Sequence, residues 1–574
     1  MMPDLVWLLL AFALLVWMAN FVRRTIGFLH LLQLEGYKSA RFRKWVIKNP
    51  GRAFSLSEAK SGIIVFGIGA LGYILGMKTW GIWIFLGAWM TGGIYLLLTH
   101  RKAKAKKPLV FTPRAIRLLG AAVILMGLVA SGLFSLLFAR GGIFSPGRFY
   151  LSSLAFFVSL HILTQGAAVN IGLANILIHP LESLINWGYL SAAKRKIKRC
   201  RPLKVIGITG SYGKTSTKHI LGCLLSTKYN VLATPESYNT PMGICKVIRG
   251  QLRPEHEIFI VEMGAYKRGD IKKLCDLTHP QIGILTSVGP QHLERFKSID
   301  NIVAAKYELI ESLPGDGVAI FNNDNRYCRL LADKTKIRTV RYATESADQK
   351  ADLPAGDICS NSQGVRFTCK GGTQFQTKLL GRHNVANILA AASAALECGM
   401  TLKEVADAVK RLEPVPHRLQ LIQGAGGVTV IDDAFNANPA GAMEALEVLK
   451  SFDQGAKVLV TPGLIELGDQ EFEQNKRFGI KAAQVCDFIF LVGPKRTIPI
   501  MEGLKEANFP KEQVVVVKSL DEASAQLKQI LKLGDVVLFE NDLPDNYSED
   551  ITTSTLDSSK FSGSGQITLW PKSI

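Results

Sequence analysis

The glycine-rich segment at residues 210–216 is the part of the sequence best suited to chemistry. It reads Gly210-Ser211-Tyr212-Gly213-Lys214-Thr215-Ser216 and joins a predicted strand at 204–208 to a helical pattern. Backbone N–H groups in such a loop and at the helix N-terminus point at phosphate. Lys214 can reach the β- and γ-phosphates, and the Thr215 hydroxyl can hold Mg²⁺. The usual G-x-x-x-x-G-K-[ST] pattern fails at one position, Ile208, and we still predict a nucleotide-binding loop.

Further segments between residues 204 and 470 keep the order and approximate spacing of one known family. Besides the loop T-G-x-x-G-K-[ST]-[ST], they are VEMGA at 261–265, VGPQHLE at 288–294, AAK at 304–306, GRHNVAN at 381–387, VIDDAFNANP at 430–439 and ELG at 466–468. This set resembles the Mur ligases, which build the peptide of bacterial cell walls, and most closely their MurF-like branch, which adds D-alanyl-D-alanine. The resemblance implies an enzyme that uses ATP to convert a carboxylate into an acyl phosphate and joins it to an amine.

The resemblance also implies a catalytic set of four residues. One Mg²⁺ ion would be held by Thr215 and Glu262, and a second by Glu262 and His292. Lys306 matches a family lysine that is carbamylated, a change that turns a cation into an anion able to support the second metal. Together with Lys214 these groups would surround the γ-phosphoryl group, where charge accumulates during transfer.

Other positions resemble the family's nucleotide and substrate neighbours. The residues implied as neighbours of the nucleotide, beyond the loop itself, are Asn322, Asp324, Arg382, His383, Asn384, Arg418 and Asp433. Asn436 and Asn438 would line the face where two domains close over the acyl phosphate. Closure would exclude water from an intermediate that otherwise hydrolyses.

The first third of the chain has the composition of a membrane domain. Residues 1–201 hold 25 Lys and Arg against 4 Asp and Glu, whereas the remainder holds 43 of each. The positive charge lies in short segments between apolar runs, so anionic lipid explains it better than nucleic acid, and we expect no nucleic-acid partner. Five runs are apolar enough to cross a bilayer, allowing about 20 residues each. They are residues 5–22, 62–77, 80–98, 115–139 and 149–178. The second is short, and the last is long enough to be tilted, broken or partly interfacial.

Charge between these runs predicts the orientation of the chain. The basic loops at 23–60 and 101–114 should be cytoplasmic, which places the N-terminus outside and everything after residue 178 inside. We therefore expect a multi-pass protein of the plasma (inner) membrane with cytoplasmic ligase domains. A secretory signal peptide is excluded, because Arg23 and Arg24 follow the first apolar run instead of preceding it. The nine cysteines include no C-x-x-C pair, which fits free thiols in a reducing compartment.

After residue 201 short β-rich runs alternate with helical segments, which indicates α/β domains with mainly parallel sheets. The predicted strands are 204–208, 258–261, 282–286, 428–431, 457–460, 488–492, 514–517 and 536–539. A Pro-rich segment at 413–416 is a natural hinge. We therefore predict a helical transmembrane domain at 1–200, a P-loop central ATP-binding domain at 201–413, a Rossmann-like C-terminal domain at 414–547 and a disordered tail at 548–574.

Two departures from the family bear on the substrate. The domain that holds the UDP end of a soluble precursor has no counterpart, and the predicted spans stand in its place. The last strand is followed by an acidic loop at 540–545, where the family has Lys-Gly-Ser-Arg. That loop either receives an incoming group with positive charge or is a solvated turn, and the sequence favours neither.

These departures leave several functions open. Our hypothesis is that the carboxylate acceptor is lipid-linked and that the amine comes from an amino acid or peptide. In the alternative, the spans only tether a ligase that acts on a soluble precursor. A poly-γ-glutamate or folylpolyglutamate type of ligase is the enzymatic alternative. A non-catalytic nucleotide-binding scaffold and a P-loop ATPase that energises the membrane part are the alternatives from other classes.

Overall fold

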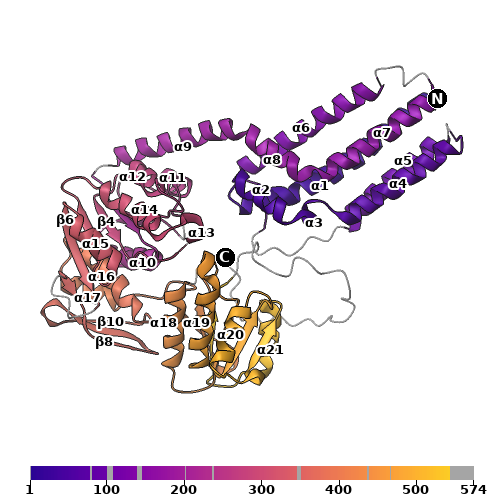
Figure 1. Cartoon of the computed structure of the whole chain (residues 1–574). Coiled ribbons are helices and arrows are strands. Elements are labelled where there is room, and N and C mark those ends of the chain that lie inside the picture. Colours follow the sequence, from indigo (N-terminus) through magenta and orange to yellow (C-terminus); the bar gives the residue numbers. More distant parts are fainter. Residues whose placement is uncertain are drawn as a thin grey trace. The chain divides into compact units, whose positions relative to one another are not determined.

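The structure, a computed structural model, describes residues 2–77, 80–99, 108–138, 145–200, 202–235, 238–291, 293–344, 351–435, 438–465 and 467–542. The chain divides into two compact units, Met1–Asn186 and Trp187–Ile574 (Figure 1). The first unit is helical and the second is built on parallel sheets.

The described part of the first unit is a bundle of helices. They are α1 Met2–Leu34, α2 Ser39–Lys48, α3 Pro50–Ala53, α4 Leu56–Ile74, α5 Trp80–Thr99, α6 Pro113–Phe138, α7 Pro146–Gln165, α8 Ala167–Leu177 and the start of α9 His179–Arg199. Its core contains Phe21, Phe85 and Phe157, all fully buried. Trp17 donates from its indole nitrogen to Leu160 O and Thr164 Oγ1, both at 2.9 Å, and so joins α1 to α7.

Four described helices are long and apolar enough to cross a membrane, and a fifth crossing is possible if α8 and α9, bent by 48°, form one span. The four are Trp7–Leu34, Trp80–Thr99, Pro113–Phe138 and Pro146–Gln165. The expected span at 62–77 is not among them. Its helix α4 ends at Ile74, so the apolar part after Ser61 is only about 20 Å long at about 1.5 Å per residue, against a bilayer core of about 30 Å. The expected run at 149–178 is interrupted at Gly166, between α7 and α8.

The central part of the second unit is a sheet of seven parallel strands in the order β2-β3-β1-β4-β5-β6-β7. The strands are β1 Lys204–Thr209, β2 Val231–Ala233, β3 Ile258–Glu262, β4 Ile282–Leu285, β5 Val318–Asn322, β6 Arg338–Ala343 and β7 Leu353–Pro354. Strand β1 lies between β3 and β4, so the loop after β1 emerges at the carboxyl edge between the ends of both. Such an edge is where ligands bind in open α/β sheets.

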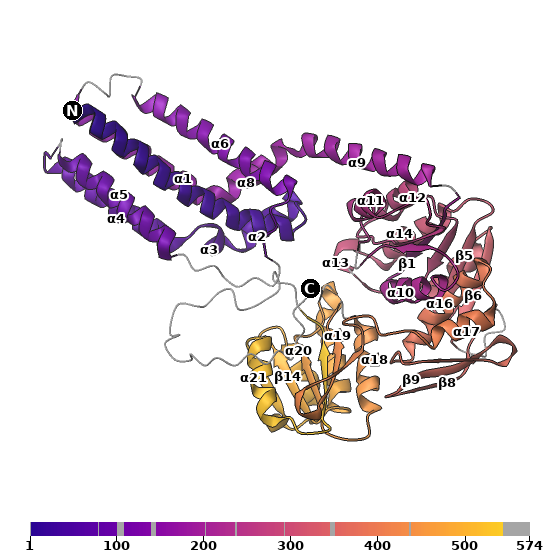
Figure 2. The same cartoon turned by 180° about the vertical axis from the view of Figure 1, so that it is seen from behind.

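Helices cover both faces of this sheet (Figures 1 and 2). One face packs against α10 Lys214–Leu225, α16 His383–Glu397 and α17 Leu402–Val409. The other packs against α11 Pro241–Gly250, α12 Asp270–Thr278, α14 Ile299–Glu311, α15 Arg326–Lys334 and the one-turn helix α13 Leu293–Phe296. The second half of α9 belongs to this core, because Ala193 and Ile197 are buried in it.

A small antiparallel sheet, β10-β9-β8, precedes α16 (Figure 2). Its elements are β8 Gly356–Asn361, β9 Gly364–Cys369, the 3-10 turn η1 Lys370–Gly372 and β10 Thr373–Thr377. Phe367 and Phe375 stack across β9 and β10 with ring centroids 4.9 Å apart and join the central core.

The C-terminal part is a six-stranded sheet in the order β11-β12-β16-β13-β14-β15, parallel except for the edge strand β11. Its strands are β11 Gln420–Gln423, β12 Thr429–Asp433, β13 Lys457–Thr461, β14 Phe488–Val492, β15 Val514–Val517 and β16 Val536–Glu540. Its helices are α18 Pro439–Lys450, α19 Glu471–Ala483, α20 Ile498–Glu506 and α21 Leu520–Ile530, with 3-10 turns η2 Ala425–Gly427, η3 Gly468–Gln470 and η4 Lys511–Gln513. Helices α18, α19 and α20 cover one face and α21 the other.

All eight strands expected from the sequence are present, with bounds that differ by a residue or so. The expected P-loop and Rossmann-like α/β pattern is therefore found in the second unit.

Helices α19 and α20 approach closely through glycines, which leads to a prediction. A Cβ at Gly479 would lie 2.4 Å from the carbonyl oxygen of Ile500, and one at Gly503 would lie 2.1 Å from that of Lys476. We expect Gly479→Ala to lower the free energy of unfolding of the C-terminal domain by about 1–3 kcal/mol, because backbone must shift. Pulse proteolysis in urea would measure it.

Gly250→Ala is the matched control. Nothing lies within 4 Å of a Cβ at this position at the end of α11. In that variant the free energy of unfolding should stay the same or rise by up to about 1 kcal/mol. Equal stability of the two variants would contradict the close approach of α19 and α20.

Candidate active site

The loop between β1 and α10 has a backbone that requires glycine at two positions. Gly210 has φ +156° and Gly213 has φ +82°. A Cβ at Gly210 would lie 1.9 Å from Thr286 Oγ1, and one at Gly213 would lie 2.5 Å from Asn387 Oδ1. The loop is therefore packed between the end of β4 and the start of α16, with no room for a side chain at either glycine.

The segment after β4 fixes the loop from one side. Ser211 donates its backbone N–H to Ser287 O at 2.7 Å and its hydroxyl to Gly289 O at 2.9 Å. Tyr212 N donates to Ser287 Oγ at 3.0 Å. These bonds hold residues 211 and 212 so that Gly213 begins α10 as its N-cap. Thr215 and Ser216 follow, half-buried, in the first turn.

Two lysine amines converge on one carbonyl oxygen in this loop. Lys214 Nζ donates to Gly210 O at 2.6 Å and to Ser211 O at 3.2 Å, and Lys306 Nζ, from α14, donates to Gly210 O at 2.8 Å. Burial lowers the pKa of Lys214 to about 8, and nearby Arg418 adds to that effect. Burial, followed by the charge of Lys214, holds the pKa of Lys306 well below its usual range. The site thus holds two amine groups, of which Lys306 is buried and Lys214 half-buried.

Glu262 stands at the end of β3 beside these amines. It is 1 % exposed, and its Oε1 accepts from Asn239 Nδ2 at 3.1 Å. Burial opposes its ionisation, but Lys218 and Lys214 outweigh burial, so the pKa of Glu262 falls below its ordinary value. Lys218 Nζ lies 3.0 Å from Oε2 and forms an ion pair with it. Glu262 is therefore a buried carboxylate that remains ionised.

The structure brings Lys214, Glu262 and Lys306 together. His292 lies outside the described residues. Within the described part of the chain there is no group of three or more His, Cys, Asp and Glu side chains placed to hold a metal ion.

The predicted nucleotide neighbours on β5 are engaged with each other and with the next strand. Asn322 Oδ1 accepts from Asp324 N at 3.0 Å. Asp324 Oδ2 accepts from both the backbone N–H and the hydroxyl of Thr344, each at 2.8 Å. These two side chains therefore order the carboxyl ends of β5 and β6 in this structure.

The predicted residues at the start of α16 also have local partners. Arg382 is the N-cap, and Asn384 Nδ2 donates to Leu380 O at 2.7 Å. Asn387 accepts from Thr217 at 3.4 Å and so links α16 to α10. His383 Nδ1 is 3.8 Å from Glu444 Oε2 on α18.

Of the two predicted substrate residues, Asn438 is described and Asn436 is not. Asn438 caps α18, because its Oδ1 accepts from Gly441 N at 3.0 Å. The cap bond uses the side-chain oxygen of Asn438 and not its amide nitrogen.

A second buried charged group lies at the carboxyl ends of β12 and β16. Asp433 and Glu540 face each other in the strand register. Burial, together with the charge of Asp433, raises the pKa of Glu540 well above its usual range, and burial also raises the pKa of Asp433 against the opposing charge of Arg418. Arg418, in turn, has its pKa lowered by burial, which Asp433, Glu262 and Glu540 oppose. The pair thus favours sharing a proton beside one arginine.

Sequence reasoning missed three residues of this region. Lys218 had a readable signal, since four residues after Lys214 is the same helix face. Asn387 lay in a recognised motif but was given no role. Glu540 was read only as part of a terminal acidic loop, because its pairing with Asp433 depends on strand order.

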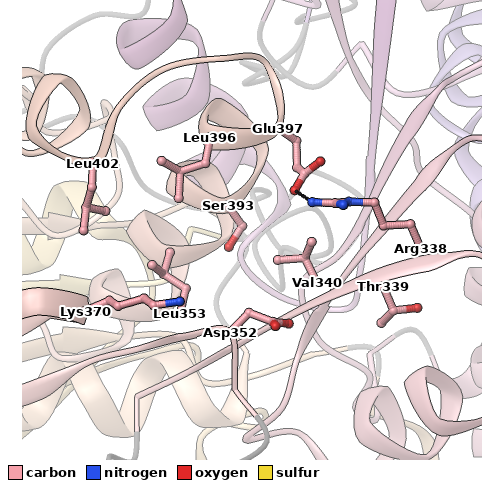
Figure 3. A pocket seen from close by; sticks show the side chains of 10 residues that line it. All are labelled: Arg338, Thr339, Val340, Asp352, Leu353, Lys370, Ser393, Leu396, Glu397 and Leu402. Carbon is pink, nitrogen blue, oxygen red and sulfur yellow. Dashed lines mark hydrogen bonds and ion pairs between the residues drawn. The ribbon is translucent and has the colours of Figure 1, made fainter.

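A cavity among the described residues lies away from this site. It holds about 410 Å³ and lies at the amino end of β6, beside the end of α16 (Figure 3). Arg338 and Glu397 form an ion pair of 2.7 Å across its rim. None of the predicted site residues lines it.

Comparison with known proteins agrees with this geometry. Residues 208–395 match the Mur ligase middle domain and residues 417–540 match the Mur ligase glutamate ligase domain. The UDP-N-acetylmuramoyl-tripeptide–D-alanyl-D-alanine ligase of Bacillus subtilis is 32% identical over 341 residues, which are 59% of this chain and 72% of that protein. The chain belongs to the Mur ligase family. It is a MurF-like member of this family of ATP-dependent ligases, which form C–N bonds in peptidoglycan synthesis.

Further relatives of this Mur ligase support the same placement. The corresponding ligase of Escherichia coli K12 is 32% identical over 340 residues, 58% of this chain and 74% of that one. The crystal structure of MurF from Acinetobacter baumannii superposes with a TM-score of 0.55 at 27% identity, covering 62% of this chain and 77% of that one. MurF from Thermotoga maritima, solved in complex with ADP, superposes with a TM-score of 0.55 at 25% identity. The match covers 62% of this chain and 80% of that one. Both domain matches lie within the second unit.

The lowered pKa of Lys214 predicts how ATP binding depends on pH. Phosphates favour the protonated amine, so ATP binds the charged form, which is lost as the pH rises through about 8. We expect the Kd for ATP to be flat below that pH and to rise by up to about tenfold per pH unit above it. Fluorescence titration of the full-length protein in detergent would measure it.

Lys214→Arg is the control for this titration, because a guanidinium stays charged throughout the range. That variant should show a shallower dependence. A wild-type Kd that does not change between about pH 7 and about pH 9 would show that Lys214 keeps its proton without nucleotide.

The buried carboxyl pair predicts a second pH effect. The folded-state pKa of Glu540 is raised, so its contribution to stability is fully present below the ordinary pKa and is lost as the pH rises from there. We expect Glu540→Gln to match the wild type near pH 4 and to be more stable by about 1–3 kcal/mol near pH 8. Chemical denaturation of the full-length protein across this range would show it.

Glu512→Gln serves as the comparison, since Glu512 is exposed in η4. It should leave the pH profile unchanged. A Glu540→Gln profile parallel to that of the wild type would mean that Glu540 is ionised at neutral pH.

Proposed function

We propose that the chain is a membrane-bound ligase that uses ATP to activate a carboxylate of a lipid-linked cell-wall precursor and joins it to an amino acid or peptide amine. The observation that carries the catalytic part is the convergence of Lys214 and Lys306 on the Gly210 carbonyl, with the ionised Glu262 beside them. A dry site with amines at a helix N-terminus suits a nucleotide triphosphate.

The proposed reaction begins at this loop. N–H groups at the start of α10 and the Lys214 ammonium bind the β- and γ-phosphates of ATP. The acceptor carboxylate attacks the γ-phosphorus, the bond to the β,γ-bridging oxygen breaks, and ADP leaves with that electron pair. The amine then attacks the acyl carbon, and inorganic phosphate leaves as the amide forms. Lys214 stabilises the charge that builds on the phosphoryl oxygens.

The residues present fit a divalent cation next to the phosphates. Glu262 is buried and ionised, and its Oε2 lies 3.0 Å from the Lys218 ammonium, so this carboxylate already accommodates positive charge. Thr215 and Glu262 would hold one Mg²⁺, and Glu262 with His292 a second. Such an ion would neutralise charge on the transferring phosphoryl group. Lys218, now beside Glu262, would keep that carboxylate ionised and oriented.

Lys306 fits the proposed carbamate. Carbon dioxide reacts with the neutral amine, and burial keeps the Lys306 amine neutral at a pH where an exposed lysine is charged. The reaction forms an N–C bond and releases one proton. The product is an anion in place of a cation, which would suit a second metal ion.

The four apolar helices of the first unit support the proposal of a plasma-membrane, multi-pass protein with cytoplasmic ligase domains. Lys and Arg outnumber Asp and Glu by 25 to 4 in residues 1–201, as expected for segments near anionic lipid. Because this unit stands before the two Mur ligase domains, a precursor attached to lipid is the acceptor we favour. Because the relatives in Bacillus subtilis and Escherichia coli are D-alanyl-D-alanine ligases by name, D-alanyl-D-alanine is the first amine to test.

Phosphate release with two acceptors tests this proposal. The full-length protein in nanodiscs receives ATP, D-alanyl-D-alanine and a tripeptide precursor that is either lipid-linked or UDP-linked. We expect release that requires both acceptor and amine, and faster release with the lipid-linked form. Lys214→Ala, the matched inactive variant, should lose turnover by about a thousandfold or more.

Each of the other outcomes rejects one part of the proposed function. Activity with the UDP-linked acceptor alone rejects the lipid-linked substrate. Hydrolysis without amine or acceptor indicates an ATPase, and no turnover with any acceptor rejects the ligase. Full activity of Lys214→Ala would refute the assigned site.

Chemical rescue tests the carbamate at Lys306. Lys306→Ala should lose most ligase activity, and a small carboxylic acid such as acetate should restore part of it by supplying the missing anion. Lys306→Arg, which retains a positive charge, should not be rescued. Absence of rescue in Lys306→Ala would leave a cationic role for Lys306 as the better explanation.

A further inference from the structure

The first unit contains a buried group of charges that ligase chemistry does not use. Arg23 and Arg24, adjacent on α1, both donate to Glu58 at the start of α4, each at 2.6 Å. Arg24 also donates to Ala53 O at 2.7 Å. Their side chains are 17 % and 7 % exposed, and that of Glu58 is 11 % exposed. Two guanidinium groups thus share one carboxylate.

No other carboxylate of this unit can balance the second arginine. Residues 1–186 contain four acidic residues: Asp4, Glu35, Glu58 and Glu182. Asp4 and Glu35 lie on or just after α1, about 16 Å or more along the axis from the arginines at about 1.5 Å per residue. Glu182 pairs with Arg117 at 2.7 Å. One positive charge therefore lacks a counter-ion within the unit.

Buried hydrogen-bond groups without partners surround this charge. Among the described residues, Arg23 Nε, Arg24 Nε and Gln165 Nε2 have no hydrogen-bond partner, and His161 Nε2 has no regular one, although its ring lies beside the backbone of Glu58. Gln165 is held next to the start of α4, because its Oε1 accepts from Ser55 N at 3.2 Å. His161 is held against α4 one turn further on, since a Cβ at Gly62 would lie 2.3 Å from its Nε2. The groups come from α1 and α7 and face the N-terminus of α4.

This chemistry fits an oxyanion. Guanidinium groups recognise phosphate with paired N–H donors, and a helix N-terminus adds a favourable dipole. The two helices that supply the donors, α1 and α7, are both long and apolar enough to cross a membrane, so a phosphate that reaches this group is expected to carry a hydrocarbon chain. Two ordinary surface arginines at a membrane boundary would be solvated and would not be enclosed with one carboxylate.

We propose that Arg23 and Arg24, with Gln165 and His161, form a binding site for the phosphate headgroup of a lipid, and that Glu58 holds the arginines in its absence. The phosphate competes with Glu58 for the guanidinium groups and supplies the missing negative charge. The site does not depend on the proposed ligase acceptor, because any lipid with a terminal phosphate has the required chemistry.

Binding of farnesyl diphosphate to the full-length protein in detergent, without ATP, tests this site. Inorganic pyrophosphate and farnesol are the comparison ligands, and native mass spectrometry or tryptophan fluorescence gives the Kd. We expect farnesyl diphosphate to bind at least tenfold more tightly than either comparison ligand. Equal binding of farnesol would overturn the proposal, since the apolar chain alone would account for it. Equal binding of pyrophosphate would replace the lipid by a free anion and also overturn it.

Variants that should change binding in opposite directions distinguish a binding site from a purely structural ion pair. Arg23→Gln and Arg24→Gln should each weaken farnesyl diphosphate binding by tenfold or more, whereas Arg43→Gln, an exposed arginine on α2, should leave it unchanged. Glu58→Gln removes the internal competitor, so it should tighten binding severalfold. A purely structural ion pair predicts no gain for Glu58→Gln, and that result would overturn the proposal even if the arginine variants fail to fold.

Discussion

The convergence of two amines on the Gly210 carbonyl is the constraint on which the catalytic half depends. Positive charges repel, and burying two of them together is tolerable only where neutralisation or an anion relieves the cost. Two features reduce this cost. The pKa of both lysines is lowered, and the Glu262 carboxylate stands at the end of the neighbouring strand β3. The strand order produces this arrangement, because β1 lies between β3 and β4. The loop after β1, the Glu262 carboxylate after β3 and the turn after β4 therefore meet at one edge of the sheet.

The sequence predicted those parts of this arrangement that are local. The glycine loop, the strand before it and the helix after it are contiguous, and eight strands could be placed by their apolar runs. Contacts between distant segments could not be placed in that way. Asp433 and Glu540 are over a hundred positions apart in the chain and meet only because β16 is inserted beside β12. Lys218 was within reach, because its spacing from Lys214 gives the same helix face.

The helices of the first unit could be placed less exactly from the sequence. Mean apolarity identifies a run but does not say where a helix bends or ends. The run at 149–178 is long enough to be broken, but only the structure places the break at Gly166. The run at 62–77 extends three residues past the end of helix α4. Hydropathy also does not distinguish an arginine in water from one enclosed by protein. Arg23 and Arg24 read as ordinary loop charges in the sequence, whereas the structure encloses both with a single carboxylate.

Helix α9 has a practical consequence for anyone who wishes to work with the catalytic half alone. It begins in the first unit and continues past the boundary after Asn186, and its later residues Ala193 and Ile197 are part of the hydrophobic core of the nucleotide-binding domain. A fragment that starts at residue 201, where the composition changes, would lack helix α9. The apolar core residues that Ala193 and Ile197 cover would then be exposed to solvent. A fragment that starts at Trp187 keeps Ala193 and Ile197 in place, so those apolar groups stay covered.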